Sequence, residues 1–296
     1  MDEKQWLADR FEEHRPHLQS VAYRMLGSLT EADDAVQDAW LRVNRAEAGD
    51  VENFGGWLTT IVSRVCLNML RSRRVRREQP LDVHVPDPVV SLDVAVQPEA
   101  EALLADSVGL ALLVVLDTLT PGERLAFVLH DMFDLPFDEI APLVGRSPEA
   151  ARQLASRGRR RVKGVGLPVP DSDFDRQRDA VQAFFRAARG GNFDDLVSVL
   201  DPDVVLRADF GDWRPAASTF ARGAETVARQ AMLASLPNAQ LHPALVNGAA
   251  GVVVTIDGRP FAVMGFVVAG GKIVEIDAIA EPERVRRATA GFFVDQ

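Results

Sequence analysis

Apolar residues recur every three or four positions along residues 1–77, which is the spacing of one buried face of an α-helix. Three helices are predicted there. The first ends at Gly27, the second carries the apolar stripe of residues 35–43, and the third runs from Trp57 to Arg77. Residues 53–56, Asn-Phe-Gly-Gly, are predicted to form a turn before the third helix.

A segment rich in proline and acidic residues interrupts this pattern. Residues 78–98 contain four prolines and few helix signals, which predicts a linker. Helical spacing resumes over residues 99–119. Residues 120–123, Thr-Pro-Gly-Glu, have the form of a capping box that opens a further helix.

The next segment has the pattern of a helix-turn-helix. A short apolar-faced helix over residues 137–144 is followed by a turn at Gly145. Ser147 and Pro148 then cap a basic helix that is predicted over residues 149–162. Two helices joined by a short glycine-containing turn are the signature of this motif.

The last part of the chain changes from helical to mixed spacing. Two helices are predicted, over residues 174–189 and 193–200. Runs of β-branched residues then predict strands, and an Asp-Gly and a Gly-Gly pair at residues 257–258 and 270–271 predict hairpin turns. The strands are expected to form a curved antiparallel sheet, and their cores lie at residues 204–206, 252–256, 261–268 and 273–279.

These patterns predict a multi-domain chain with two all-α domains, a helical bundle and a helix-turn-helix, and a C-terminal α+β domain. The first helical domain is predicted over residues 1–77 and is followed by an acidic linker over residues 78–98. The helix-turn-helix domain is predicted over residues 99–163, a second linker over 164–172 and the α+β domain over 173–296.

Composition excludes several classes of protein. The chain has 296 residues, of which 47% are hydrophobic and 26% charged, which is ordinary for a folded protein. Its single cysteine, Cys66, rules out a disulfide scaffold, and its five histidines show no metal-ligand spacing. No apolar run is long enough to span a membrane, and the N-terminus does not resemble a signal peptide. We therefore expect a cytoplasmic protein without a metal or cofactor.

Charge is distributed unevenly along the chain. The net charge is −10, yet arginines cluster over residues 64–77 and again, with Lys163, over residues 146–163. Between Arg77 and Arg124 there is no Lys or Arg but there are nine acidic residues. Two basic modules joined by an acidic tether favour two anion-binding surfaces over two merely solvated helix faces.

The helix-turn-helix supplies the first set of candidate DNA-binding residues. Arginine pairs with guanine and glutamine with adenine in the major groove, while the helix N-terminus can approach a phosphate. The alternative is an αα-hairpin whose arginines are solvated. The candidates are Ser147, Arg152, Gln153, Ser156, Arg157 and Arg160.

Two further surfaces are predicted near the N-terminus. Aromatic and polar groups on the third helix suit unpaired bases, although Trp57 taken alone is expected to be a core residue. The candidates on that helix are Asn53, Phe54, Trp57, Arg64, Asn68 and Arg71. The second helix carries a mostly acidic face that is either solvated or docks a basic partner, formed by Asp34, Gln37, Asp38 and Arg42.

Three motifs in this order resemble the sigma-70 family. Residues 34–43, DAVQDAWLRV, are similar to its region 2.2. Residues 56–64, GWLTTIVSR, with the arginines of 71–74 are similar to regions 2.3 and 2.4. Residues 137–157, which include FDEIAPLVG and SPEAARQLASR, are similar to region 4.2. The resemblance is to the extracytoplasmic-function group and covers roughly residues 8–163.

This resemblance implies a role for each surface. Asp34, Gln37, Asp38 and Arg42 would face the β′ clamp of core RNA polymerase, and region 4 would contact its β flap. The third helix would open and hold the −10 element of promoter DNA, and the helix after Gly145 would read the −35 element. The acidic linker would pass through the polymerase near the RNA exit path.

The C-terminal domain resembles the SnoaL-like (NTF2-like) α+β cone in residues 183–196 and 200–204. Sigma factors with such a tail form a SigJ-like subgroup, in which the tail acts as a built-in regulator that touches the linker. Residues 85–90, VPDPVV, resemble the subgroup's linker motif, whereas the tail's loop reads DFGDW at 209–213 in place of a glycine-rich sequence. The resemblance implies regulatory roles for Pro86, Asp87, Pro88, Asp209 and Asp212.

Two alternatives to a sigma factor remain open from the sequence. One is a stand-alone helix-turn-helix regulator with the cone as its sensor pocket. The other is a cyclase or isomerase, since a buried carboxylate in such a cone has a raised pKa and can act as a base. We expect no enzyme, because no spacing connects the available titratable residues Asp209, Asp212, His242 and Asp277.

Overall fold

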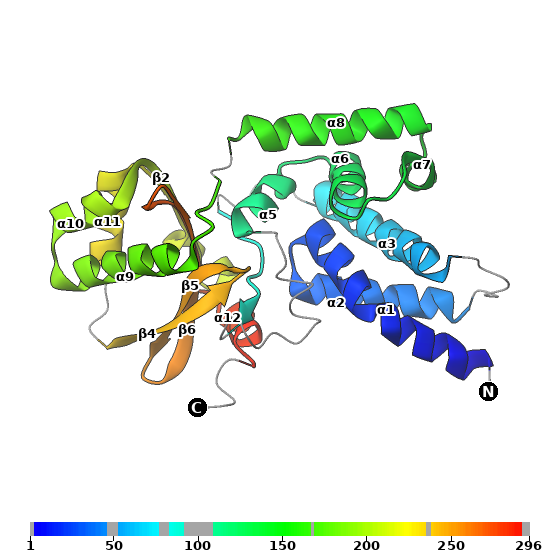
Figure 1. Cartoon of the computed structure of the whole chain (residues 1–296). Helices are drawn as coiled ribbons and strands as arrows, with labels where there is room; N and C mark the ends of the chain where they lie inside the picture. Colours follow the sequence, from blue (N-terminus) through cyan, green and yellow to red (C-terminus); the bar gives the residue numbers. More distant parts are fainter. Residues whose placement is uncertain are drawn as a thin grey trace. The chain divides into compact units, whose positions relative to one another are not determined.

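The computed structural model describes residues 3–45, 53–76, 83–91, 109–166, 169–234 and 238–291. The chain divides into two compact units (Figure 1). The first unit is helical and contains Met1–Pro80 and Val115–Gly166. The second contains the sheet and comprises Leu81–Val114 and Leu167–Gln296. The described part of the predicted linker, residues 83–91, therefore belongs to the second unit.

Three long helices form the N-terminal part of the first unit. They are α1 (Glu3–Leu26), α2 (Leu29–Val43) and α3 (Phe54–Arg76), and each packs against the other two. The prediction of a turn over residues 53–56 is wrong. The Asn53 side chain accepts a hydrogen bond from the Gly56 N–H at 2.9 Å, and this cap starts α3 at Phe54.

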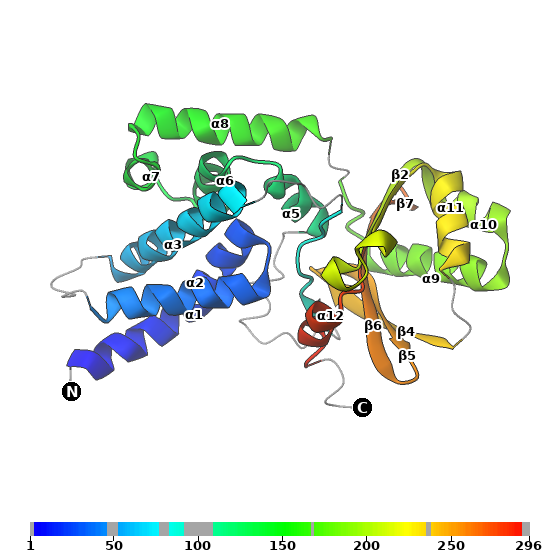
Figure 2. The same cartoon turned by 180° about the vertical axis from the view of Figure 1, so that it is seen from behind.

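The helix-turn-helix lies in the same unit. After α5 (Leu110–Asp117) come α6 (Pro121–Phe127), a π-helical turn (Val128–Met132), α7 (Phe137–Val144) and α8 (Pro148–Gly164). Figures 1 and 2 show α8 alongside α6 and α7. The helical pattern over residues 99–119 is described only from Gly109 onward, and residues 92–108 lie outside the described part.

A buried arginine joins the two helical parts of this unit. Arg124 of α6 donates from Nε and Nη2 to the backbone oxygen of Arg24, at 3.2 and 3.1 Å, and it pairs with Asp117. Its side chain is almost fully buried. A buried charge with three satisfied contacts fixes α6 to the end of α1.

The second unit is built on one seven-stranded sheet in the order β1-β4-β5-β6-β7-β2-β3. The strands are β1 (Val90–Ser91), β2 (Leu200–Asp209), β3 (Thr219–Arg222), β4 (Ala239–Val246), β5 (Ala249–Ile256), β6 (Arg259–Ala269) and β7 (Lys272–Ile279). The expectation of an antiparallel sheet is wrong for one pair, because β2 and β7 run parallel. The predicted turns at 257–258 and 270–271 are confirmed, since all four residues have positive φ.

Helices cover one face of this sheet. α9 (Phe174–Gly190), α10 (Phe193–Val199) and α11 (Ala224–Leu233) pack there around a core that includes Phe184, Leu196 and Phe266. Two short helical turns (Gly211–Trp213 and Pro215–Ala217) connect β2 to β3, and α12 (Pro282–Ala288) follows β7. α11, α12, β3 and β4 were not predicted, although the Asn-Gly pair at 247–248 is the turn signal that marks the β4–β5 hairpin.

On the opposite face of the sheet, two glycines lie where there is no room for a side chain. A Cβ on Gly265 would lie 2.9 Å from Leu110, and a Cβ on Gly251 would lie 2.7 Å from the Met264 oxygen and closer still to Val246. Both glycines therefore allow a close approach that a larger residue would block.

We expect Gly251→Ala to destabilise the second unit by about 1–3 kcal/mol, because the added methyl group meets backbone and a β-branched side chain. Gly190→Ala is the matched control: a Cβ there meets nothing within 4 Å, and alanine favours the helix. Urea unfolding of both variants measures the difference. Equal stability of the two variants would show that Val246 and the Met264 backbone shift at little cost to accommodate the added methyl group.

Candidate functional site

The basic helix α8 packs against α6 through a face of small residues. Ala151, Ala155 and Gly158 form its buried face, and a Cβ on Gly158 would lie 3.1 Å from Phe127 of α6. The Ser147 hydroxyl caps the helix by accepting the Ala150 N–H at 3.3 Å. Away from this buried face, Arg152, Gln153, Arg157 and Arg160 are exposed and Ser156 is half-buried.

Several arginines of α8 are tied to the rest of the motif. Glu123 binds Arg157 at 3.1 Å and Arg161 at 3.0 Å, and Arg159 binds Asp131 at 2.5 Å. Burial alone would raise the pKa of Glu123, but hydrogen bonds from Thr120 and Arg157 outweigh it and the pKa is lowered. This ionised carboxylate fixes the angle at which α8 lies across α6.

The candidate residues of α3 form one exposed stripe. Arg64, Asn68 and Arg71 are exposed, whereas Leu58, Val62 and Leu67 are buried. At the helix start Phe54 contacts the rings of Trp57, Trp6 and His14, with centroids 5.6, 5.7 and 6.0 Å apart. Trp57 is thus partly exposed within an aromatic cluster and is not a core residue.

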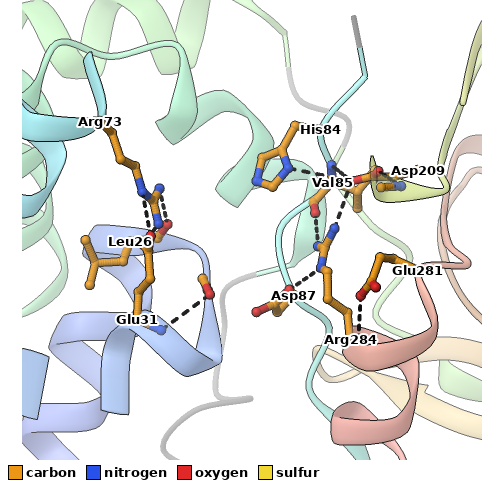
Figure 3. A network of polar contacts seen from close by, with 11 residues as sticks. Leu26, Glu31, Arg73, His84, Val85, Asp87, Asp209, Glu281 and Arg284 are labelled. Atoms are coloured by element: carbon orange, nitrogen blue, oxygen red, sulfur yellow. Dashed lines mark hydrogen bonds and ion pairs between the residues drawn. The ribbon is translucent and has the colours of Figure 1, made fainter. Parts of the chain in front are cut away.

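The far end of α3 is fixed by Arg73. Its Nε donates to Glu31 of α2 at 3.0 Å and its Nη1 to the backbone oxygen of Leu26 at 3.0 Å (Figure 3). α2 itself buries Ala35, Val36 and Ala39. The acidic-face residues Asp34, Gln37 and Arg42 are exposed and Asp38 is half-buried, and Asp38 pairs with Arg42 at 2.8 Å.

Within the second unit, the C-terminal α+β domain binds residues 83–91, which we call the linker strap. Arg284 of α12 contacts Asp87, the backbone oxygen of Val85 and, at 2.9 Å, Asp209 (Figure 3). The Val85 N–H donates to Asp209 at 3.0 Å, and the His84 ring lies 3.6 Å from the same carboxylate. Pro86, Asp87 and Pro88 are consequently buried.

The strap continues into the sheet. The Val89 N–H donates to the side chain of Asn247 at 3.0 Å, and the Asn247 N–H donates to the Val89 oxygen at 2.8 Å. Val90 and Ser91 then pair with β4 as the edge strand β1. The strap is therefore fixed at both of its ends, by an ionic contact and by a strand pairing.

Asp209 is the common acceptor at the ionic end. Burial raises its pKa, but the contact with His84, the N–H groups of Val85 and Gly211 and the charge of Arg284 outweigh burial, so the pKa lies well below its ordinary value. Gly211 is required there because a Cβ would collide with Glu281, which caps α12. Asp212 is exposed and lies outside this network.

Two other titratable candidates of the second unit, Asp277 and His242, contact residues outside the strap. Burial and the charge of Glu275 raise the pKa of Asp277 to about 7, against the opposing effect of Arg207, which binds both carboxylates. His242 contacts the Thr255 hydroxyl at 3.0 Å. None of Asp209, Asp212, His242 and Asp277 is among the described residues that line the cavity of this unit.

Comparison with known proteins identifies the family. The family models Sigma-70 region 2 and Sigma-70, region 4 match residues 10–76 and 109–162. The chain is 37% identical over 287 residues to the ECF RNA polymerase sigma factor SigJ of Mycobacterium tuberculosis, covering 93% of this chain and 91% of that protein. The chain belongs to the extracytoplasmic-function (ECF) sigma factors.

Two further comparisons agree. The probable ECF sigma factor SigI of Mycobacterium tuberculosis is 33% identical over 278 residues, with 91% of each chain covered. The crystal structure of Mycobacterium tuberculosis SigJ matches with a TM-score of 0.73 at 33% identity, covering 95% of this chain and 98% of that one. The predicted fold class is confirmed: this ECF sigma factor has helical sigma domains followed by a C-terminal α+β domain.

The structure adds residues that the sequence did not indicate. Arg284 and Asn247 hold the strap; Arg284 belongs to no recognisable motif, and the Asn-Gly pair at 247–248 indicates a hairpin turn but not a contact with the strap. No helix in the described residues of this ECF sigma factor combines the length and the hydrophobicity that crossing a membrane requires. Across the same residues, no group of three His, Cys, Asp or Glu side chains is placed to hold a metal ion.

We expect Arg284→Met to destabilise the second unit by about 3–5 kcal/mol, because it leaves the buried Asp87 and Asp209 without their cation. Arg286→Met, on the same helix, is the control. Its side chain is 79% exposed, and we expect a change below about 0.5 kcal/mol. Urea unfolding distinguishes the two, and a mild effect of Arg284→Met would show that the strap contributes little to stability.

The strap is also expected to be sensitive to acid. Because the folded-state pKa of Asp209 lies below the unfolded value of about 3.9, the unfolded chain binds more protons between the two values. The stabilisation is complete above about pH 5 and is lost as the pH falls. Asp209→Asn should therefore destabilise the protein by about 1 kcal/mol less at pH 3 than at pH 7, as measured by urea unfolding. An equal effect at both pH values would contradict this assignment.

Proposed function

We propose that this ECF sigma factor directs core RNA polymerase to promoters, with α3 at the −10 element and α8 at the −35 element. The observation that carries the proposal is that both helices are fixed on one face by buried contacts and present a polar, arginine-containing stripe on the other. In this proposal residues 1–77 and 99–163 are the promoter-binding domains and residues 173–296 a regulatory domain.

At the −35 element, α8 would lie in the major groove. Arg152 and Gln153 lie next to each other near its N-terminus and would read base edges. Arg157 has its Nε occupied by Glu123, which leaves its other donors for a phosphate. The remaining contacts would come from Ser147, Ser156 and Arg160.

At the −10 element, α3 would hold separated strands. Phe54 and Trp57 offer partly exposed rings on which unpaired bases can stack. The Asn53 side chain stands at the helix start, and Arg64, Asn68 and Arg71 continue the stripe along which the DNA backbone would run.

Core polymerase would bind through α2. Asp34, Gln37, Asp38 and Arg42 form the exposed face proposed to meet the β′ clamp, and the helix-turn-helix domain is proposed to meet the β flap. Leu41 is 48% exposed on the same helix and adds an apolar contact to this face. Such a function is carried out in the cytoplasm.

The C-terminal domain would regulate activity through the strap. The chain between α3 and α5 passes through residues 83–91, and these are held by Arg284, Asp209 and Asn247. Strap binding would thus limit how the two promoter-binding helices reach their elements. We propose no catalytic role for the domain, because none of its candidate acids is among the described residues that line the cavity.

Transcription with purified core polymerase tests the proposal. We expect promoter-specific transcripts only when full-length protein and core enzyme are combined. Strong sequence-specific binding to duplex DNA by the protein alone, with no association with core polymerase, would instead favour a stand-alone regulator.

Gln153→Ala is expected to relax preference at one −35 base pair by about 1–3 kcal/mol, because a bidentate contact to a base edge is lost. Arg176→Ala, an exposed change on α9, should leave the preference unchanged. Transcription from a set of promoters with single −35 substitutions measures both. A uniform loss across all promoters would place Gln153 outside the reading face.

A further inference from the structure

The second unit contains a cavity of about 390 Å³ between the sheet and helices α9 and α11. This volume lies within the range of small-molecule sites. Its lining is almost entirely apolar and includes Phe184, Phe185, Leu206, Phe210, Phe261 and Met264.

The lining determines which ligands the cavity could accept. Among the described lining residues Arg189 is the one charged group, and no carboxylate is present to compensate a buried cation. Arg189 is exposed and donates to the Ala239 oxygen at 2.7 Å, and Leu233, also in the lining, is 82% exposed. The cavity therefore reaches solvent near these residues and suits an apolar molecule whose polar end is neutral or anionic.

The wall of the cavity is continuous with the strap site. Ala208 and Phe210 line the cavity, and Asp209 between them points to the opposite face, as alternation along a strand requires. Ala280 also lines the cavity, and its N–H donates to the backbone oxygen of Asp209 at 2.8 Å. The next residue, Glu281, caps the helix that carries Arg284.

We propose that an apolar small molecule binds in this cavity and stabilises the strap-bound state of the protein. When the strap is bound, its contacts hold Asp209 and α12 in place, and with them the cavity-wall residues Phe210 and Ala280. The cavity is then preorganised and binds the ligand more tightly than in the strap-released state. By linkage, the ligand strengthens strap binding by the same factor. The regulatory consequence of this coupling rests on the proposed function.

Hydrogen exchange of the full-length protein tests the coupling, with anilinonaphthalene sulfonate as an apolar, anionic probe. The amides of Val85 and Val89 report the strap, because both are hydrogen-bonded to side chains of the second unit. We expect saturating probe to slow their exchange by at least about fivefold, the low end of typical couplings. Reciprocally, Arg284→Met should weaken probe binding by a similar factor.

Ala278→Phe, which fills the cavity, should abolish saturable probe fluorescence, and Ala216→Phe, an exposed change outside the lining, should preserve it. The wild-type and Arg284→Met measurements decide the matter even if Ala278→Phe does not fold. Absence of saturable binding to the wild type would falsify the ligand site. Binding without slower exchange at Val85 and Val89 would overturn the coupling. Neither measurement involves polymerase, so each outcome is independent of the promoter-recognition tests.

Discussion

The C-terminal half of this molecule depends on one buried guanidinium. Arg284 is mostly buried, and its charge is compensated by Asp87, Asp209 and the Val85 oxygen together. Removing any one acceptor leaves a charged group poorly solvated, which is far more expensive than losing an exposed ion pair. The contacts of the ionic end therefore stabilise one another, and the loss of one weakens the others.

The elements that sequence predicts well are those whose signals are local. Thr120 and Glu123 make their capping box three residues apart, and the turn at residues 257–258 needs only two residues with positive φ. The strap contact has no such signal, because Asp87 and Arg284 are 197 positions apart. The parallel pairing of β2 with β7 is long-range in the same sense. The family resemblance indicated Asp87 and Asp209 but gave no indication of their cation.

The two proposed DNA-binding helices achieve rigidity in different ways. α8 uses small residues to approach α6 closely and a single buried carboxylate, Glu123, to hold two of its arginines. α3 is fixed at one end by Asn53 and at the other by Arg73. Recognition side chains on such anchored helices are positioned before DNA arrives, which reduces the ordering entropy that binding would otherwise cost.

The alternation of side chains along a strand determines which residues of the C-terminal sheet face the cavity and which face the linker strap. It directs Asp209 away from the cavity and toward the strap, while the flanking Ala208 and Phe210 face inward. Asp277 lies one residue from Ala278 and is neutralised by Arg207 on the outer face. None of these acids is among the described residues that line the cavity, and that lining is almost entirely apolar. The same alternation places Asp209, the acid that holds the linker strap, directly behind the cavity wall formed by its two neighbours.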